Sequence, residues 1–136
     1  MIKLPSGLEL KSLIEDLRAF SWEAADILLY YSKVLKDSKY KSNILKNDNN
    51  EEPVTLADLQ VNDVLIKRIN EKYREIEWEI LSEENAKVDS ENFETRSDWI
   101  WVLDPLDGTK DFIQGTGNYA MHLALNFKHK PYLGFV

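Results

Sequence analysis

The feature that most constrains the fold is the segment WIWVLDPLDGTKDF, residues 99–112, in which an unbroken apolar run ends abruptly in acidic residues. Continuous hydrophobicity from Trp99 to Leu103 is typical of a strand that is covered on both faces. Asp104 then marks the carboxyl end of the strand, and Asp107 follows three residues later. Folding alone gives little reason for this arrangement, so the segment indicates a functional site where the strand ends.

We expect a tight turn directly after this strand. Asp is favoured at the first position of a turn, Pro105 suits the second, and Gly108 tolerates backbone conformations closed to other residues. Such a turn would bring Asp104 and Asp107 to the same side. Carboxylates held that close repel unless they are protonated or bridged by a cation, and Mg²⁺ prefers all-oxygen ligation. The same residues also make a good turn without any further function, and taken alone they leave both interpretations open.

The residues after Gly108 predict a short helical turn with Thr109 as its N-cap. The start of a helix presents free N–H groups, which favour an anion such as phosphate. Metal ligands and phosphate-binding groups would then lie only a few residues apart.

Two other acidic positions are candidates for the same site. WEILSEEN is again a strand that ends in acids, Glu83 and Glu84, and two strand ends could pool their carboxylates at one edge of a sheet. A Glu pair after a strand is more often simply solvated. Asp58, in PVTLAD, is the third candidate, although an acid three residues after Thr55 also suits a capping box and the helix dipole.

Two helices are predicted before any strand. The first should span about residues 8–36 and open with a capping box formed by Ser6 and Glu9. A polar connection, residues 36–53, should follow it. The second helix should follow Pro53 and Thr55. One stripe of this helix is apolar, and it consists of Val61, Leu65, Ile69 and Tyr73.

The remainder of the chain is predicted to form strands. A charged stretch, residues 82–98, separates the first two of them and should be solvated. The last strand should follow a hairpin at KHKP, residues 128–131. We expect a single domain, residues 1–136, of the α+β class, with two amino-terminal helices packed on a largely antiparallel sheet. The predicted strands are Ile76–Leu81, Trp99–Leu103, Tyr119–Phe127 and Pro131–Val136.

Composition and missing motifs exclude several classes of function. A formal net charge of −7 argues against a nucleic-acid polymer as partner, and if the protein handles phosphates, this charge favours divalent cations between protein and substrate. The absence of cysteine excludes disulfides and zinc–thiolate sites. Without a signal peptide or an apolar run long enough for a membrane span, we expect a cytoplasmic protein. An EF-hand that began at Asp104 would need oxygen ligands at positions 106 and 108, which are Leu106 and Gly108, so this motif is excluded. His122 is interpreted as a strand residue and not as a zinc ligand.

PVTLAD, EILSEEN and WVLDPLDGTKDF occur in this order and are followed by GNYAMHLAL. In this the chain resembles the amino-terminal half of the inositol monophosphatase superfamily of Mg²⁺-dependent, lithium-sensitive phosphatases. The form DPLDGTKDF is similar to the branch of 3'(2'),5'-bisphosphate nucleotidases. The resemblance implies the layered α/β sugar-phosphatase fold and hydrolysis of the 3'-phosphate of adenosine 3',5'-bisphosphate to AMP and phosphate, by metal-activated water. An inositol- or sugar-phosphate phosphatase, or an inactive half-domain that binds metal or a partner, is the alternative.

The resemblance also implies a role for each site residue, with two or three Mg²⁺ ions as cofactors. Glu83, Asp104 and the carbonyl of Leu106 would hold one ion, and Asp104 with Asp107 would bridge to a second. Thr109, together with Glu83 or Asp58, would orient the attacking water. The N–H groups of Gly108 and Thr109 would contact the phosphate of a small nucleotide or sugar substrate.

Members of this family are about twice as long as 136 residues. Their carboxyl-terminal half supplies a Trp-Asp motif that completes the second metal site, so we expect a chain truncated at its carboxyl end. If Val136 is the natural terminus, the second metal site should be weak and the activity low. The implied protein partners are therefore a second copy of the chain or the missing carboxyl-terminal half.

Overall fold

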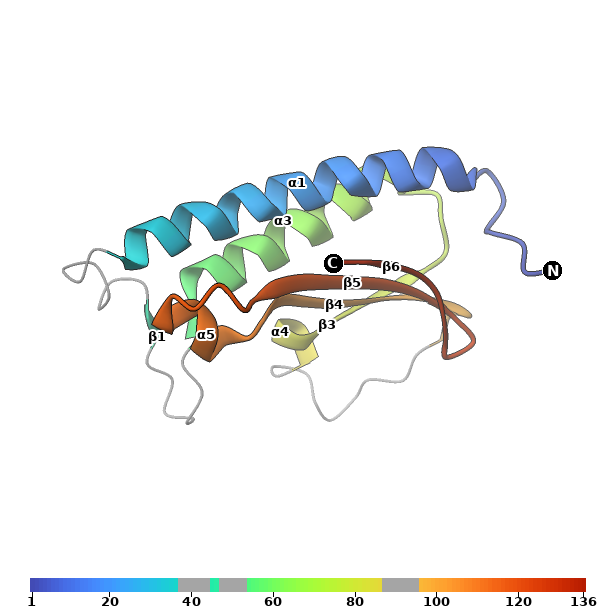
Figure 1. The fold of residues 1–136 in the computed structure, drawn as a ribbon. Coiled ribbons are helices and arrows are strands. Elements are labelled where there is room, and N and C mark those ends of the chain that lie inside the picture. Colours follow the sequence, from blue (N-terminus) through green and yellow to red (C-terminus); the bar gives the residue numbers. More distant parts are fainter. Residues whose placement is uncertain (37–44, 47–53, 87–95) are drawn as a thin grey trace.

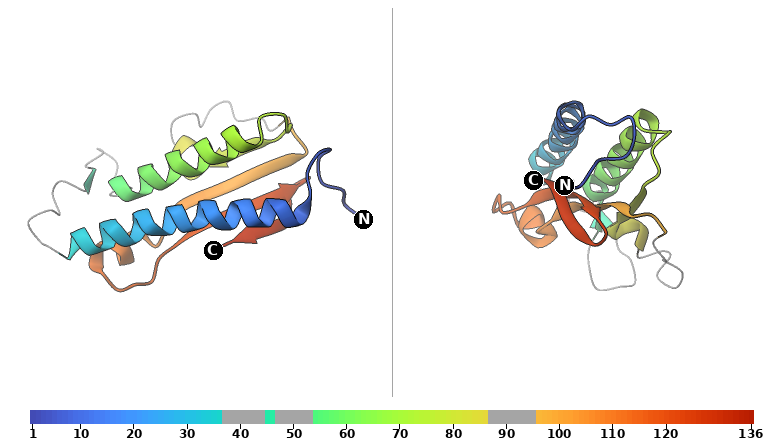
Figure 2. Two further views of the ribbon diagram at one scale, coloured as in Figure 1. Left: turned by 90° about the horizontal axis from the view of Figure 1, so that it is seen from above. Right: turned by 90° about the vertical axis from the view of Figure 1, so that its right-hand side faces the viewer.

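Two long helices lie on one face of a four-stranded sheet in the computed structural model, which describes residues 1–36, 45–46, 54–86 and 96–136 (Figures 1 and 2). The helices are α1 and α3, and the sheet has the order β3-β4-β5-β6. Two short strands, β1 and β2, form a separate antiparallel pair. The bounds are α1 Leu10–Leu35, β1 Leu45–Lys46, β2 Val54–Thr55, α3 Leu56–Lys72, β3 Glu79–Ser82, α4 Glu83–Ala86, β4 Trp99–Asp107, α5 Thr109–Gln114, β5 Ala120–Phe127 and β6 Lys130–Phe135.

The α+β prediction and the largely antiparallel sheet are confirmed. Only one of the three pairings in the main sheet is parallel, that of β3 with β4. Most of the predicted connection at 36–53 and of the predicted solvated stretch at 82–98 lies outside the described residues. Within these ranges the structure contains β1 and the short helix α4, neither of which was predicted.

Helix α1 begins later than its predicted capping box. The N-cap is Glu9, and no side-chain hydrogen bond caps the helix, so the assignment of Ser6 as the cap is wrong. The reason is a turn just before the helix, in which the N–H of Leu8 donates to the carbonyl of Pro5 at 3.2 Å. Gly7 has a φ of +86° in this turn, a conformation that keeps Ser6 outside the helix.

The core lies between the helices and the near face of the sheet. Leu17 of α1, Leu65 of α3, and Trp101 and Leu103 of β4 belong to one buried cluster. The apolar stripe predicted for α3 is confirmed for Val61, Leu65 and Ile69, which are fully buried. Their helical spacing places them on one face of α3, and this face packs against the core.

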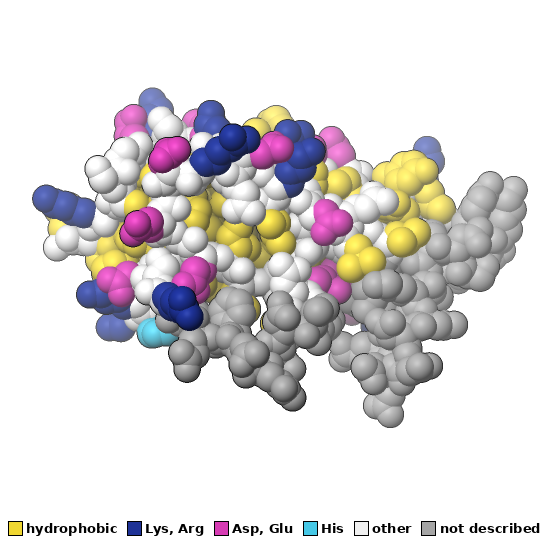
Figure 3. Space-filling model, turned by 180° about the vertical axis from the view of Figure 1, so that it is seen from behind, with side chains coloured by type: hydrophobic (Ala, Val, Ile, Leu, Met, Phe, Trp, Pro, Cys, Tyr) yellow, Lys and Arg dark blue, Asp and Glu magenta, His cyan; other side chains and the backbone are white. Residues whose placement is uncertain are grey.

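The outer surfaces of the helices are charged and carry both signs. Arg68 of α3 donates two hydrogen bonds, each of 2.9 Å, to Glu23 of α1. Figure 3 shows acidic and basic side chains interspersed along the helical side of the molecule. These pairs are solvent-exposed, so each contributes little to stability and mainly keeps the helical surface polar.

Strand β4 is longer and less completely covered than its sequence predicts. Ile100 is 5% exposed on the face turned away from the buried cluster, but Val102 on that face is 37% exposed. The predicted tight turn at 104–107 is wrong, because the strand continues through it. Asp104 pairs with His122 and Asp107 pairs with Ala120, so two residues of β4 face one residue of β5 in a bulge.

The hairpin predicted at KHKP is confirmed. It joins β5 to β6 through Lys128 and His129, whose φ values of 48° and 66° match the mirror-image turns favoured in hairpins. His122 lies in β5, as interpreted from the sequence. None of the helices in the described part of the chain combines the length and hydropathy that crossing a bilayer would need.

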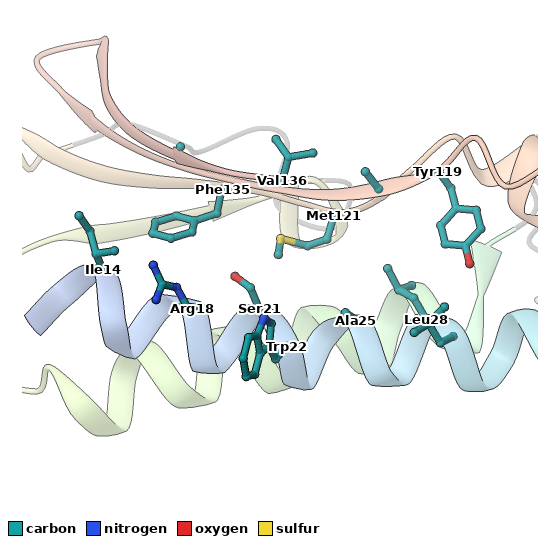
Figure 4. Close-up of a pocket in the computed structure, with 13 residues that line it drawn as sticks. Ile14, Arg18, Ser21, Trp22, Ala25, Leu28, Tyr119, Met121, Phe135 and Val136 are labelled. Atoms are coloured by element: carbon teal, nitrogen blue, oxygen red, sulfur yellow. The ribbon is translucent and has the colours of Figure 1, made fainter. Parts of the chain in front are cut away.

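A groove of about 630 Å³ lies between α1 and two strands of the sheet, β5 and the edge strand β6. Figure 4 shows side chains of α1, among them Ile14 and Ser21, facing Met121 of β5 and Phe135 of β6. Its lining is mostly apolar, and Trp22 and Leu29 on its helical rim are 69% and 61% exposed. This part of the surface is therefore hydrophobic although the rest of the helical face is charged.

Candidate active site

The parallel pairing of β3 with β4 brings two of the predicted acids together. Ser82 is the register partner of Leu103, so Glu83, where β3 gives way to α4, lies beside Asp104, which is still inside β4 and pairs with His122 on its other side. Both line a cavity of about 330 Å³. Its other lining residues are Leu106, Asp107, Gly108, Thr109, Lys110 and Asp111.

Asp104 has a strongly perturbed acidity. Burial, a hydrogen bond with Glu83 and the negative charge of Glu83 raise its pKa to about 6, while the N–H of Leu106, which donates to Oδ1 at 3.2 Å, lowers it. The charge of Asp107 also raises this pKa. The hydrogen bond places the carboxyl groups of Glu83 and Asp104 in contact, an arrangement that favours a proton or a cation between them.

The bulge positions the residues that follow Asp104. The side chain of Leu106 is buried, only 2% exposed, while its carbonyl accepts the Thr109 hydroxyl at 3.3 Å. The assignment of Thr109 as the N-cap of α5 is wrong, because Gly108 occupies that position with a φ of +80°. A Cβ at Gly108 would lie 2.5 Å from the carbonyl oxygen of Asn118, so only glycine fits here.

The other two aspartates of the segment point to different partners. The Asp107 side chain is 62% exposed, and its Oδ2 lies 3.9 Å from Nδ1 of His122. Asp111 accepts the hydroxyl of Thr116 at 2.7 Å and so fastens the end of α5 to the following loop. Asp107 therefore remains a candidate ligand at the rim, whereas Asp111 has a structural contact.

Asp58 is buried in the first turn of α3 and 5% exposed, and it is not among the described residues that line the cavity. The structure thus brings six of the seven predicted site residues together around the cavity, and Asp58 is not among them. Sequence reasoning missed Lys110, which adds a positive charge to the lining. It also missed the buried polar residues Asn62 and Ser82. The sequence holds a signal for each: Asn62 lies one helical turn after Asp58, and Ser82 directly precedes Glu83.

The donor chemistry of the cavity fits Mg²⁺, because its ligand candidates are carboxylates and a backbone carbonyl. The contact between Glu83 and Asp104 is the kind that a cation would relieve. Across the described ranges, no three His, Asp or Glu side chains converge as a formed metal site. Asp107 is exposed enough to turn toward the other two.

Comparison with known proteins decides the family. The model of the inositol monophosphatase family matches residues 9–136. The chain belongs to the inositol monophosphatase family. The predicted resemblance to this family is therefore confirmed.

The curated relatives include bisphosphate nucleotidases. The 3'(2'),5'-bisphosphate nucleotidase CysQ of Haemophilus influenzae is 38% identical over 94 residues, which are 68% of this chain and 32% of that protein. CysQ of Salmonella typhimurium is 31% identical over 91% of this chain and 47% of that protein. The chain therefore spans less than half the length of these relatives, and it corresponds to their amino-terminal part.

Solved structures of family members share the fold. Inositol monophosphatase II of Staphylococcus aureus superimposes with a TM-score of 0.65 at 23% identity, over 92% of this chain and 40% of that one. SaIMPase-II with 2'AMP bound gives a TM-score of 0.59 at 25% identity, over 91% of this chain and 40% of that one. The predicted sugar-phosphatase fold is thus confirmed for the amino-terminal part that the chain covers.

Proposed function

We propose that the chain carries the principal metal ligands of an Mg²⁺-dependent phosphomonoesterase. Its substrate would be adenosine 3',5'-bisphosphate, from which the 3'-phosphate is removed to give AMP and phosphate. The observation that carries this proposal is the contact of Glu83, where β3 ends, with Asp104 of the neighbouring strand β4, in one cavity with Gly108 and Thr109. The likeness to CysQ nucleotidases favours this substrate. The absence of cysteine fits the reducing cytoplasm as its compartment.

Each candidate ligand has a role in this proposal, with two or three ions bound. Glu83, Asp104 and the Leu106 carbonyl would hold one Mg²⁺, and Asp104 with Asp107 would bridge to a second. Buried Leu106 and the bulge around it give its carbonyl a fixed place at the cavity. When bound, the ions would supply electrostatic stabilisation of the transferring phosphoryl group and make water more acidic.

The remaining cavity residues would bind and orient the reactants. The N–H groups of Gly108 and Thr109 would donate to phosphate oxygens, and Lys110 would add a positive charge to the same side. The Thr109 hydroxyl would orient the attacking water. Glu83 or Asp58 would accept the proton of this water, either through Thr109 or through a further water molecule. In the structure this hydroxyl donates to the carbonyl of Leu106, so it is already placed beside a candidate ligand.

An inositol- or sugar-phosphate phosphatase is the second candidate. The solved neighbours favour it, since they include staphylococcal inositol monophosphatases, one of them with inositol monophosphate bound. A noncatalytic half-domain is the third. The open edge of the sheet favours it, because β6 is the last strand in the order of the described sheet. In that case the outer strand β6 would offer its free edge to a partner.

The three candidates predict different phosphate release with Mg²⁺. We expect release from adenosine 3',5'-bisphosphate to exceed release from inositol monophosphate, and Asp107→Asn to lower it by at least tenfold. Asp98→Asn is the matched control. The Asp98 side chain is 64% exposed, forms an ion pair with Lys128 and lies just before the start of β4, away from the cavity. Equal release by the chain and Asp107→Asn would refute the catalytic assignment. Mg²⁺ binding without release would favour the half-domain.

A further inference from the structure

A buried hydrogen bond joins helix α3 to the corner that carries Glu83. Ser82, the last residue of β3, is fully buried, and its hydroxyl donates to Oδ1 of Asn62 on α3. Asn62 is itself only 4% exposed. Two polar side chains this far from water satisfy each other, because an unpaired buried group carries an uncompensated desolvation cost.

The same two residues fix the backbone of the corner. The oxygen of Ser82 accepts the N–H of Glu84 at 3.2 Å, which is the contact an N-cap serine makes with the second residue of a helix. Nδ2 of Asn62 also lies 3.4 Å from Oδ1 of Asn85 and donates to it. Helix α4 is therefore held at its second residue by Ser82 and at its third by Asn62, and Ser82 is itself bonded to Asn62 of α3.

Glu83 is the first residue of α4, and the contact between Ser82 and the N–H of Glu84 spans it. Its carboxyl group contacts Asp104, whose backbone is fixed separately by its place inside β4, opposite His122 of β5. A change in the path of the corner would turn the Glu83 carboxyl away from Asp104 without disturbing β4. The direction of Glu83 thus depends on α3 through Ser82 and Asn62.

We propose that Asn62 and Ser82 are positioning residues for the metal site, which hold Glu83 in the orientation that Mg²⁺ binding with Asp104 requires. This inference rests on the proposed function. Groups behind the ligands of a metal site typically alter its affinity by 10-fold to 100-fold when they are lost. If the pair were merely structural, its loss would lower folding stability, and any loss of Mg²⁺ affinity would disappear once that stability was restored.

Three variants separate the two roles. Ser82→Ala removes the cap of α4 and leaves Oδ1 of Asn62 buried without its partner, so the thermal midpoint should fall. The double variant Asn62→Leu/Ser82→Ala removes both polar groups and should recover most of that midpoint. Ser97→Ala is the matched control. Like Ser82, Ser97 accepts the N–H of the residue two positions later, here Trp99, at 3.2 Å. This contact lies at the start of β4, away from the candidate site.

The measurements are thermal unfolding without metal and isothermal titration with Mg²⁺ alone, on the full chain. We expect Ser82→Ala and the double variant each to bind Mg²⁺ about tenfold more weakly than the parent, although the double variant has regained stability. Ser97→Ala should keep the parental affinity.

Two results would overturn the inference, and they differ in what else they affect. If the double variant regains parental Mg²⁺ affinity together with its stability, the pair is structural and the metal site stands. If Asp104→Asn binds Mg²⁺ as well as the parent does, the site itself is wrong, and the proposed function falls with this inference.

Discussion

Ser82 and Leu103 are direct partners in the parallel ladder between β3 and β4, and the residue after each is an acid of the candidate site. Continuing this register by one residue places Glu83, where β3 has ended, beside Asp104, which is still inside β4. A shift by one residue would turn one of the two side chains to the other face of the sheet. The site therefore depends on strand register, which the buried side chains of β4 specify.

The raised pKa of Asp104 predicts that the metal-free protein becomes more stable as the pH falls from 7 to 5. The folded state binds this proton with a pKa of about 6, against 3.8 for an ordinary aspartate. The contribution is therefore complete below about pH 4 and is lost as the pH rises through 6. The expected gain is about 1 kcal/mol, since solvent screens a site this open.

Urea unfolding at pH 5 and pH 7 in the presence of a chelator measures this gain. Asp104→Asn is the control, because an amide cannot titrate, and its difference between the two pH values should be smaller than that of the parent. An equal difference in both proteins would mean that Asp104 does not have the raised pKa.

Asp104→Asn should also have opposite effects with and without Mg²⁺. Without metal, removing one of two close carboxyl charges should raise the thermal midpoint at pH 7.5 by a few degrees, consistent with a gain of about 1 kcal/mol. With millimolar Mg²⁺ the parent should gain stability by mass action and the variant should gain little. Differential scanning calorimetry with and without Mg²⁺ tests this, and an equal gain in both proteins would place the ion elsewhere.

The two long helices and the four strands of the main sheet could be predicted because each depends on local pattern, whereas the contact between the acids depends on strand register. The apolar stripe of α3 and the Asp, Pro and Gly residues after Trp99–Leu103 are visible in the sequence itself. The short helix α4 could not be predicted in the same way. Its cap is Ser82, and the hydroxyl of that serine is directed by Asn62, which lies 20 residues earlier in the chain.

The errors around the bulge have the same origin. Asp104 and Pro105 suit a tight turn locally, but pairing with β5 keeps the segment in the strand as far as Asp107. Thr109 was a reasonable N-cap by residue type. The close approach of Asn118 instead requires a residue without Cβ at Gly108, and that contact comes from a different part of the chain.

Gly108→Ala should destabilise the protein by more than Gly115→Ala does. Both glycines have positive φ, +80° and +76°, so each substitution carries a backbone cost of about 1–2 kcal/mol. The new Cβ at 108 would also lie 2.5 Å from the carbonyl oxygen of Asn118, whereas nothing lies within 4 Å at 115. Urea unfolding should show an extra cost at 108 of about 1–3 kcal/mol from overpacking. Equal costs would mean that the loop around Asn118 moves freely.

The groove between α1 and β6 should bind an apolar dye, and neighbouring residues of α1 allow a matched test. Leu29 and Tyr30 are 61% and 63% exposed, but only Leu29 is among the described residues that line the groove. Leu29→Asp should lower the fluorescence of bound 8-anilinonaphthalene-1-sulfonate at least twofold, because a charge in an apolar groove disfavours the dye. Tyr30→Asp should leave it near the parental value. A similar loss in both variants would indicate that the dye binds the helix surface in general, and the groove would then have no special affinity for apolar groups.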